Sequence, residues 1–301
     1  MSIQWFPGHM NKARREIRQA MPKVDLVIEV LDARMPFSSE NPLVPELRGA
    51  KPLIRILNKS DLADPAVTAA WLRHLSGSPE VRAFAHHARQ PGLMQAVMGI
   101  ARELVPPVRV RPMAAMILGV PNVGKSTLIN ALAARTLAKT ENRPAVTQRQ
   151  QQIRVGSDLI LIDTPGFLWP KLSPPDCGYR LALLGSVPDR LVDPEALAYF
   201  AVRFLAASYP AALGQFYGIR ELPSDAPQIV EAIGRSRGFL QKGGVVDQRR
   251  AAERLILDFR SGNFGLISLE RPRVAPAPEP EEEPVTAPES AYISEESTPE
   301  G

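Results

Sequence analysis

The sequence has few of the residues that build disulfide or metal-stapled proteins: one cysteine and four histidines among 301 residues. The single cysteine, Cys177, excludes an intramolecular disulfide and any zinc site that needs several cysteines, so we expect a reducing, cytoplasmic setting. No uninterrupted apolar run approaches the roughly 18 residues of a membrane span, and the N-terminus lacks the apolar stretch of a signal peptide. We therefore expect neither export nor a membrane span.

Basic residues are missing from the last part of the chain. Residues 274–301 contain eight glutamates, many prolines and serines, and no lysine or arginine. Since the whole chain carries a net charge of +4, residues 1–273 carry +12. A segment of this composition buries too little apolar surface to order itself. The sequence predicts a disordered acidic tail after a basic body, and a basic body favours a polyanionic partner such as RNA.

A phosphate-binding loop is the strongest motif present. Residues 119–126 read Gly-Val-Pro-Asn-Val-Gly-Lys-Ser, the complete G-x-x-x-x-G-K-[ST] pattern, after a predicted buried strand at 113–118. Between a strand and a helix, such a loop directs successive backbone N–H groups and a helix N-terminus at phosphates. Lys125 is expected to reach the β- and γ-phosphates and Ser126 to hold Mg²⁺. The predicted nucleotide contacts here are Pro121, Asn122, Val123, Gly124, Lys125, Ser126 and Thr127. The alternative is a glycine turn in an unrelated α/β protein.

Two further segments supply groups for the phosphates. The predicted strand 158–163 ends in Asp163-Thr-Pro-Gly166, which puts a carboxylate where a Walker-B aspartate holds Mg²⁺. Gly166 has no Cβ, so its N–H can approach the γ-phosphate. Thr147, between the two motifs, is predicted to give Mg²⁺ its hydroxyl and the γ-phosphate its N–H.

The base is predicted to be guanine. Asn58-Lys-Ser-Asp61 follows a predicted strand at 53–57. The Asp61 carboxylate accepts two parallel hydrogen bonds from guanine N1–H and N2–H₂, whereas adenine lacks that pair of donors. Asn58 would bridge purine and loop, and the Lys59 stem would cover the ring. Taken alone, the tetrapeptide is more simply interpreted as a polar strand-to-helix turn; the phosphate loop in the same chain favours guanine recognition. We assign no side chain to a second base-contacting loop, although residues 81–87 occupy its expected position.

The base motif precedes the phosphate loop, the reverse of the order in ordinary small GTPases. A sheet tolerates a different cut in the chain if each strand keeps its place, so the sequence predicts a circularly permuted G domain. The motif order, with Trp5-Phe-Pro-Gly-His-Met10 and Leu31-Asp-Ala-Arg-Met-Pro36, resembles the YlqF/RbgA family of circularly permuted ribosome-biogenesis GTPases. The resemblance implies a bacterial, cytoplasmic GTP hydrolase that acts late in assembly of the large (50S) ribosomal subunit as a checkpoint. It also implies nucleotide-dependent binding to rRNA.

The resemblance also addresses a chemical gap. Ras-like proteins orient the attacking water with a glutamine after Asp-x-x-Gly, but here Phe167 follows Gly166. The family pattern assigns that role to His9; the alternative is that His9 packs or caps the first helix. Thus Lys125, Thr147, Gly166 and His9 form the predicted catalytic set, with Mg²⁺ held by Ser126, Thr147 and Asp163. Asn122 matches an asparagine that binds K⁺ in related GTPases, or else is a polar loop residue.

The predicted fold is a mostly parallel α/β sheet with helices on both faces, followed by a small all-helical domain. We expect an N-terminal segment with a basic helix (1–22), the G domain (23–175), the helical domain (178–270) and the tail (274–301). The first helix carries Ala13, Ile17, Ala20 and Met21 on one arc and basic side chains opposite, which suggests phosphate contacts or an ordinary solvated face. We expect a monomer. The alternative function is a GTP-regulated RNA-binding scaffold with negligible turnover.

Overall fold

A six-stranded sheet forms the centre of the protein, whose computed structural model describes residues 8–105, 111–133 and 151–272. Its strand order is β3-β2-β1-β4-β6-β5. The edge strand β5 is antiparallel to β6, and all other neighbours are parallel. The strands are β1 (Leu26–Asp32), β2 (Leu53–Asn58), β3 (Val81–Ala85), β4 (Met113–Leu118), β5 (Gln151–Val155) and β6 (Leu159–Asp163).

The two central strands are buried along their whole length because helices cover both faces of the sheet. Every residue of β1 and of β4 is buried, including the charged Glu29 and Asp32 of β1. Largely aliphatic runs of this kind are typical of parallel strands that have no solvent-facing side. Asp32 and Asn58 are register partners at the carboxyl ends of β1 and β2, and Ile117 pairs with Asp163 at the same edge. Ligands of open α/β sheets bind at this edge.

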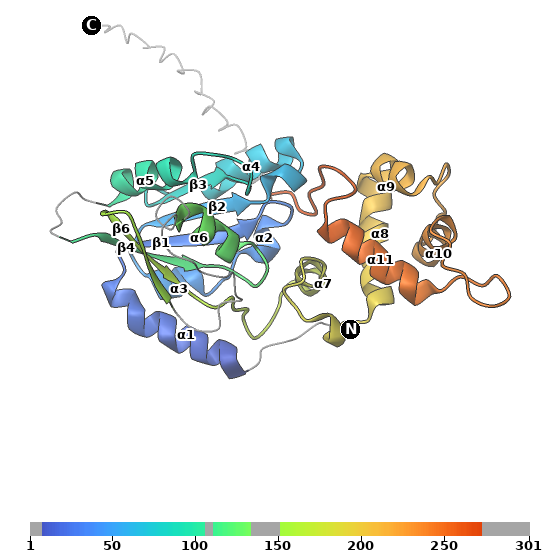
Figure 1. Cartoon of the computed structure of the whole chain (residues 1–301), viewed down its shortest axis with the longest axis horizontal. Helices are drawn as coiled ribbons and strands as arrows, with labels where there is room; N and C mark the ends of the chain where they lie inside the picture. The colour runs from blue at the N-terminus through green and yellow to red at the C-terminus, as the bar shows by residue number, and fades with distance from the viewer. Residues whose placement is uncertain (1–7, 106–110, 134–150, 273–301) are drawn as a thin grey trace, which may run out of the picture.

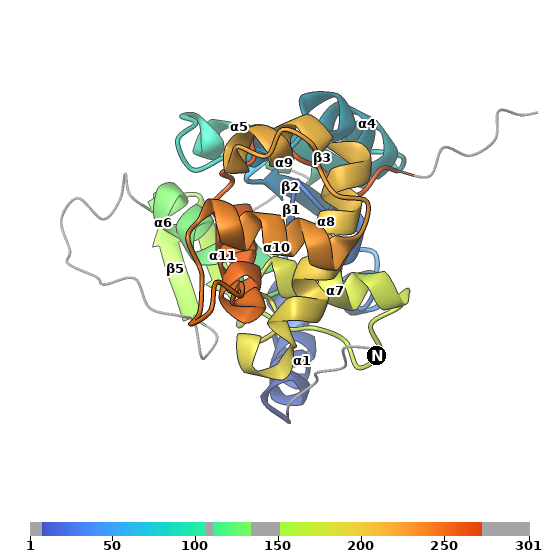
Figure 2. The same cartoon turned by 90° about the vertical axis from the view of Figure 1, so that its right-hand side faces the viewer.

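Helices lie on both sides of the strands. Figure 2 shows α5 and α6 on one side of the sheet and α4 on the other. Asp64 caps α4 by accepting hydrogen bonds from Ala66 N and Val67 N, with Pro65 at the first helical position. The helices of this part are α1 (Gly8–Ala20), α2 (Pro36–Ser39), α3 (Val44–Arg48), α4 (Pro65–Leu75), α5 (Leu93–Leu104) and α6 (Lys125–Ala133), with 3₁₀ turns η1 (Met21–Lys23) and η2 (Ser60–Leu62).

A second group of helices, here called the helical region, stands beside the sheet (Figure 1). It comprises α7 (Pro175–Leu183), η3 (Asp189–Leu191), α8 (Pro194–Ser208), α9 (Pro210–Tyr217), α10 (Ala226–Ser236) and α11 (Gln248–Arg260). Capping aspartates begin three of its helices: Asp193, Asp225 and Asp247. Helix α11 packs against α8 and α10, and its Ala251, Leu255, Ile256 and Phe259 are buried.

After α11 the chain returns to the G domain. Gly262 turns the backbone after α11 with φ +75°, a conformation that glycine adopts readily at a helix end. Ile267 N then donates to Leu62 O at 3.0 Å, and Leu269 N donates to Arg34 O at 2.7 Å. The indole of Trp71 donates to Glu270 O at 3.1 Å. The last residues of the predicted helical domain therefore contact the base-loop side of the sheet.

The first helix packs as its sequence pattern predicts. Ala13, Ile17 and Met21 are buried and Ala20 is partly buried, whereas Lys12 and Arg15 are exposed.

Among the described residues, no single helix is long and apolar enough to cross a membrane, although α8 and α9 would meet both criteria if their sharp bend were ignored.

Candidate functional site

The phosphate loop is shaped by two glycines that tolerate no side chain. Gly119 has φ +149°, and a Cβ there would lie 2.6 Å from Val30 O. Gly124 has φ +100°, and a Cβ there would collide with the amide of Asn58. Both positions lie in the region of backbone space that favours glycine. The loop therefore runs close to β1 and to the base motif, with α6 beginning at Lys125.

Lys125 lies inside the loop. Its ammonium donates to Gly119 O at 3.0 Å and Val120 O at 2.9 Å, and the residue is buried. Burial lowers the pKa of Lys125 to about 8, and the charge of Asp163 opposes that shift. Gly166 closes the other side: a Cβ there would lie 2.8 Å from Pro121 Cα and 2.9 Å from Lys125 Nζ. The two phosphate motifs thus meet around one ammonium group.

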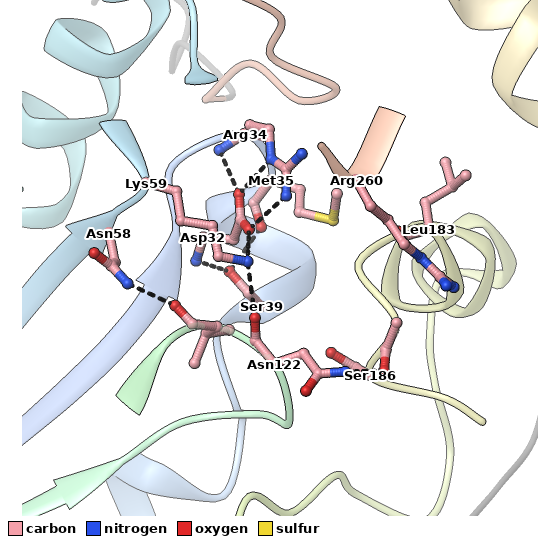
Figure 3. Close-up of polar contacts among 12 residues, drawn as sticks. Asp32, Arg34, Met35, Ser39, Asn58, Lys59, Asn122, Leu183, Ser186 and Arg260 are labelled. Carbon is pink, nitrogen blue, oxygen red and sulfur yellow. Dashed lines mark hydrogen bonds and ion pairs between the residues drawn. The ribbon is translucent and has the colours of Figure 1, made fainter. Parts of the chain in front are cut away.

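The base motif is tied to the phosphate loop by two hydrogen bonds. Asn58 Nδ2 donates to Val123 O at 2.8 Å, and Lys59 Nζ donates to Asn122 O at 2.8 Å (Figure 3). Lys59 and Asn122 both have positive φ, which is uncommon outside glycine. Asp61 is exposed in the turn η2. The structure therefore brings the two predicted motifs together, although about 60 residues separate them in the chain.

The second base loop, to which the sequence assigned no side chain, also lies beside this motif. Ser60 N donates to His86 O at 3.1 Å, and His86 N donates to Leu57 O at 2.9 Å. Residues 86 and 87 therefore follow β3 directly alongside the turn that carries Asp61. The contacts are made by the backbone, which explains why side-chain chemistry gave no signal.

Hydrogen bonds and burial fix the segment that follows Asp163. Thr164 Oγ1 donates to Ile117 O at 2.7 Å, and Phe167 is completely buried, so its side chain cannot orient a water molecule. Asn41 Nδ2 donates to Phe167 O at 3.0 Å. Leu168 N donates to the Met10 sulfur at 3.4 Å, which puts the start of α1 against the chain two residues beyond Gly166. His9 lies in this first turn of α1.

Of the predicted metal-binding residues, Ser126 and Asp163 stand at the phosphate loop, at the start of α6 and the end of β6. A hydroxyl and a carboxylate are suitable oxygen ligands for Mg²⁺, which keeps several waters and phosphate oxygens in its shell. Thr147 lies outside the described residues. Within the described residues, no three His, Cys, Asp or Glu side chains cluster to form a metal site of their own.

The sequence did not reveal that the helical region contacts the phosphate loop. Asn122 Nδ2 donates to Gly185 O and Ser186 Oγ donates to Pro121 O, each at 2.5 Å. It also gave no role to Asp32, whose carboxylate lies 3.0 Å from Lys59 Nζ. These contacts join segments that are distant in the chain, so no local sequence pattern indicated them.

A phosphate loop behind β4, an aspartate ending β6 and a base motif earlier in the chain define a circularly permuted P-loop GTPase, an enzyme that hydrolyses GTP. A family model described as 50S ribosome-binding GTPase matches residues 114–184. The chain is 42% identical to ribosome biogenesis GTPase A of Priestia megaterium over 288 residues, which cover 92% of this chain and 100% of that protein. It is 31% identical to the protein of the same name from Thermotoga maritima, with 90% and 95% covered.

A solved structure agrees. The GDP-bound structure of TM YlqF superimposes with a TM-score of 0.65 and 30% identity, covering 86% of this chain and 99% of that one. The chain belongs to the ribosome biogenesis GTPase A family, as its motifs predicted. It is a GTPase of ribosome biogenesis.

Proposed function

We propose that this GTPase acts late in assembly of the large ribosomal subunit, where it binds rRNA in a nucleotide-dependent way and serves as a checkpoint. The observation that carries this proposal is the direct contact between the phosphate loop and the helical region, Asn122 to Gly185 and Pro121 to Ser186. A change at the phosphates is transmitted through these bonds to a surface outside the G domain. The matching model is described as a 50S ribosome-binding GTPase, which supports the choice of subunit.

Within the site, we assign guanine recognition to Asp61, with Asn58 and the Lys59 stem at the purine. Lys125, the loop amides and the Gly166 N–H hold the phosphates. Ser126, Asp163 and Thr147 would hold Mg²⁺, which supplies charge neutralisation at the phosphates. The amide nitrogen of Asn122 donates to Gly185, so its oxygen is the atom that would ligate K⁺.

For hydrolysis, we assign the orientation of the attacking water to His9. The support is twofold. The side chain of Phe167 is buried and apolar, and the Met10–Leu168 contact brings the start of α1 next to the segment after Gly166. In this scheme the chain stabilises charge on the transferring phosphoryl group with Lys125 and the Gly166 N–H.

The expected partners are GTP, GDP and the precursor of the large subunit with its rRNA. We expect a monomer that acts in the cytoplasm, where ribosomes assemble. The alternative, a scaffold that uses GTP only as a conformational ligand, differs in the need for a water-orienting residue. A scaffold needs none, whereas the hydrolase depends on one.

Co-sedimentation on sucrose gradients tests this proposal. The full chain is mixed with ribosomal subunits in the presence of GDP or a non-hydrolysable GTP analogue. We expect it to migrate with the large subunit only with the analogue, and Lys125→Ala, which weakens triphosphate binding, to lose that difference. Binding that is identical with both nucleotides, or absent with both, would overturn the checkpoint role.

A further inference from the structure

The segment Leu31-Asp-Ala-Arg-Met-Pro36 has no part in the chemistry above, yet two of its charged side chains are buried. Asp32 is 0% exposed and Arg34 is 2% exposed. Buried charges are costly unless they are paired and hydrogen-bonded. Here they form a two-pronged pair, with Arg34 Nε 3.0 Å from Asp32 Oδ1 and Nη2 3.0 Å from Oδ2. Arg34 N also donates to Oδ1 at 3.0 Å, so the carboxylate is held on both oxygens.

The Asp32 carboxylate also holds the lysine of the base motif. Its Oδ2 lies 3.0 Å from Lys59 Nζ, the ammonium that donates to Asn122 O in the phosphate loop. Lys59 adopts a left-handed backbone conformation with φ +59°, which costs free energy unless its surroundings enforce it. Burial alone would raise the pKa of Asp32, but the charges of Arg34 and Lys59 hold it far below its usual range. The Asp32 carboxylate therefore stays ionised and positions the Lys59 ammonium toward the phosphate loop.

The remaining nitrogen of the Arg34 guanidinium, Nη1, contacts the helical region. Its Nη1 donates to Phe259 O at 3.0 Å, and its guanidinium lies 5.0 Å from the centroid of the Phe259 ring. Phe259 belongs to the last turn of α11, where carbonyl groups and the helix dipole favour a cation. Figure 3 shows Asp32 between Lys59 and Arg34, so one continuous set of contacts runs from the base motif to α11.

A cavity of about 430 Å³ lies at this junction, lined by residues that include Arg34, Lys59, Asn122, Gly185, Asp189 and Arg260. The ionic contacts of Arg34 and Lys59 therefore border open space rather than close-packed side chains on this side.

We propose that Asp32 and Arg34 are positioning residues that couple occupancy of the guanine-binding loop to the C-terminal turn of α11. A purine on the Lys59 stem restrains the ammonium, the ammonium restrains the Asp32–Arg34 pair, and Arg34 restrains Phe259. By reciprocity, a partner that grips the end of α11 changes nucleotide affinity by the same factor. The inference rests on the proposed role of Lys59 at the base.

Hydrogen exchange of the full chain, measured by mass spectrometry with and without GDP, tests this coupling. In the wild type we expect GDP to slow exchange in three segments: 58–62, 119–128 and 256–262. In Arg34→Gln, protection of the two nucleotide loops should persist while protection of 256–262 is lost. Release of a fluorescent GDP should become about tenfold faster, as expected for one charge-assisted hydrogen bond. Equal protection of 256–262 in both proteins would overturn the proposal.

Two further variants make the result specific. Arg254→Gln removes a guanidinium that pairs with Asp258 at 3.0 Å within α11, and it should retain the GDP-dependent protection of 256–262. Arg34→Lys keeps a charge beside Asp32 but cannot bridge Asp32 and Phe259 together. Arg34→Lys should restore nucleotide affinity without restoring the protection of α11. If it restored both, the proposed bridging geometry would be contradicted. This variant also keeps the test available if Arg34→Gln does not fold.

The outcomes also separate this inference from the proposed function. If GDP protects neither 58–62 nor 119–128 in the wild type, the proposed nucleotide site itself fails. If GDP protects both loops but leaves 256–262 unchanged, the nucleotide site stands and the coupling alone is wrong.

Discussion

At the scale of residues, the four side chains of the base motif differ in their burial and in their contacts. Asn58 is buried and Lys59 is half-buried, and both donate to backbone carbonyls of the phosphate loop. Asp61 alone among the four is exposed, in the turn η2. This exposure is consistent with the proposal that the Asp61 carboxylate pairs with guanine while Asn58 and Lys59 hold the loop.

Asp61→Asn should exchange guanine for xanthine specificity. The amide replaces one acceptor oxygen with a donor and removes the charge, so we expect GTP affinity to fall by about ten- to a hundredfold while xanthosine triphosphate gains. Equilibrium titration with fluorescent analogues of both nucleotides measures the exchange. Asp64→Asn, whose parent carboxylate caps α4, is the control and should leave the ratio of the two affinities unchanged. Unaltered GTP binding in Asp61→Asn would remove this residue from the site.

The pKa of Glu29 predicts a pH-dependent stability. Burial in the middle of β1 raises it from 4.5 to about 7, against the charge of Arg55. The folded protein therefore binds this proton more tightly than the unfolded chain, and the free energy of unfolding should fall as pH rises from 4.5 to 7. In Glu29→Gln, the side-chain oxygen still accepts from Asn41 N, and Arg55 keeps its contact with Glu40. Its stability should vary less with pH and exceed the wild type at pH 8 by about 1–3 kcal/mol.

Urea unfolding between pH 5 and pH 8 measures this difference. Glu103→Gln, a change at an exposed glutamate on α5, is the control and should follow the wild-type curve. Wild-type and Glu29→Gln stabilities that run parallel over the whole window would contradict the raised pKa.

At the scale of elements, the sequence predicted the parts whose local signals are strong. The strands predicted at 53–57, 113–118 and 158–163 appear as β2, β4 and β6, where their apolar runs indicated. Strand β5 was not predicted because its first residues are exposed glutamines at the sheet edge, with no alternation to mark them. The return of residues 266–271 to the sheet depends on backbone bonds to Arg34 and Leu62, which no local pattern encodes.

In the candidate site too, features with a local sequence signal were predicted and long-range contacts were not. The glycines and Lys125 were found from the motif because a phosphate loop has a fixed local geometry. The contacts of Asn122 with Gly185 and of Lys59 with Asp32 were not, since each joins elements that fold together only in three dimensions. Sequence motifs thus predicted which segments form the candidate site, and the structure shows the contacts that join those segments.

The position of α1 against the chain just beyond Gly166 leads to a prediction on turnover. His9→Ala should keep GTP affinity and lose most of the ribosome-stimulated rate, by roughly ten- to a thousandfold, because positioning dominates phosphoryl transfer. Single-turnover hydrolysis with saturating large subunits measures it, since a low basal rate would hide the effect. Gln19→Ala, on the exposed side of the same helix, is the control. Equal stimulated rates in wild type and His9→Ala would assign the water to another group.

At the scale of the whole molecule, charge is distributed unevenly. Residues 1–273 carry +12, while residues 274–301, outside the described residues, carry eight glutamates and no basic residue. On α1, Arg14 and Arg18 are 3.4 Å and 2.5 Å from Glu46, so part of their charge is already neutralised within the protein. Arg15 is exposed on the same helix, and Lys12 is exposed with its ammonium 3.8 Å from Glu16, a longer contact than that of either arginine with Glu46; these two are the better candidates for phosphate contacts.

This distribution predicts the salt dependence of RNA binding. Each phosphate that the protein neutralises releases counterions, so affinity for a large-subunit rRNA fragment should fall steeply as salt rises. Reversing Lys12 and Arg15 to glutamate should reduce the slope of log affinity against log salt by roughly 1–2. Reversing Arg73 and Arg102, exposed on α4 and α5, changes the net charge equally and should alter the slope less.

Deleting residues 274–301 should not weaken binding, because the charge of the tail has the same sign as that of RNA. Filter binding from about 50 to 300 mM salt measures all four proteins; a flat response in the wild type, or equal slopes for the two double reversals, would show that α1 does not dock on the phosphate backbone.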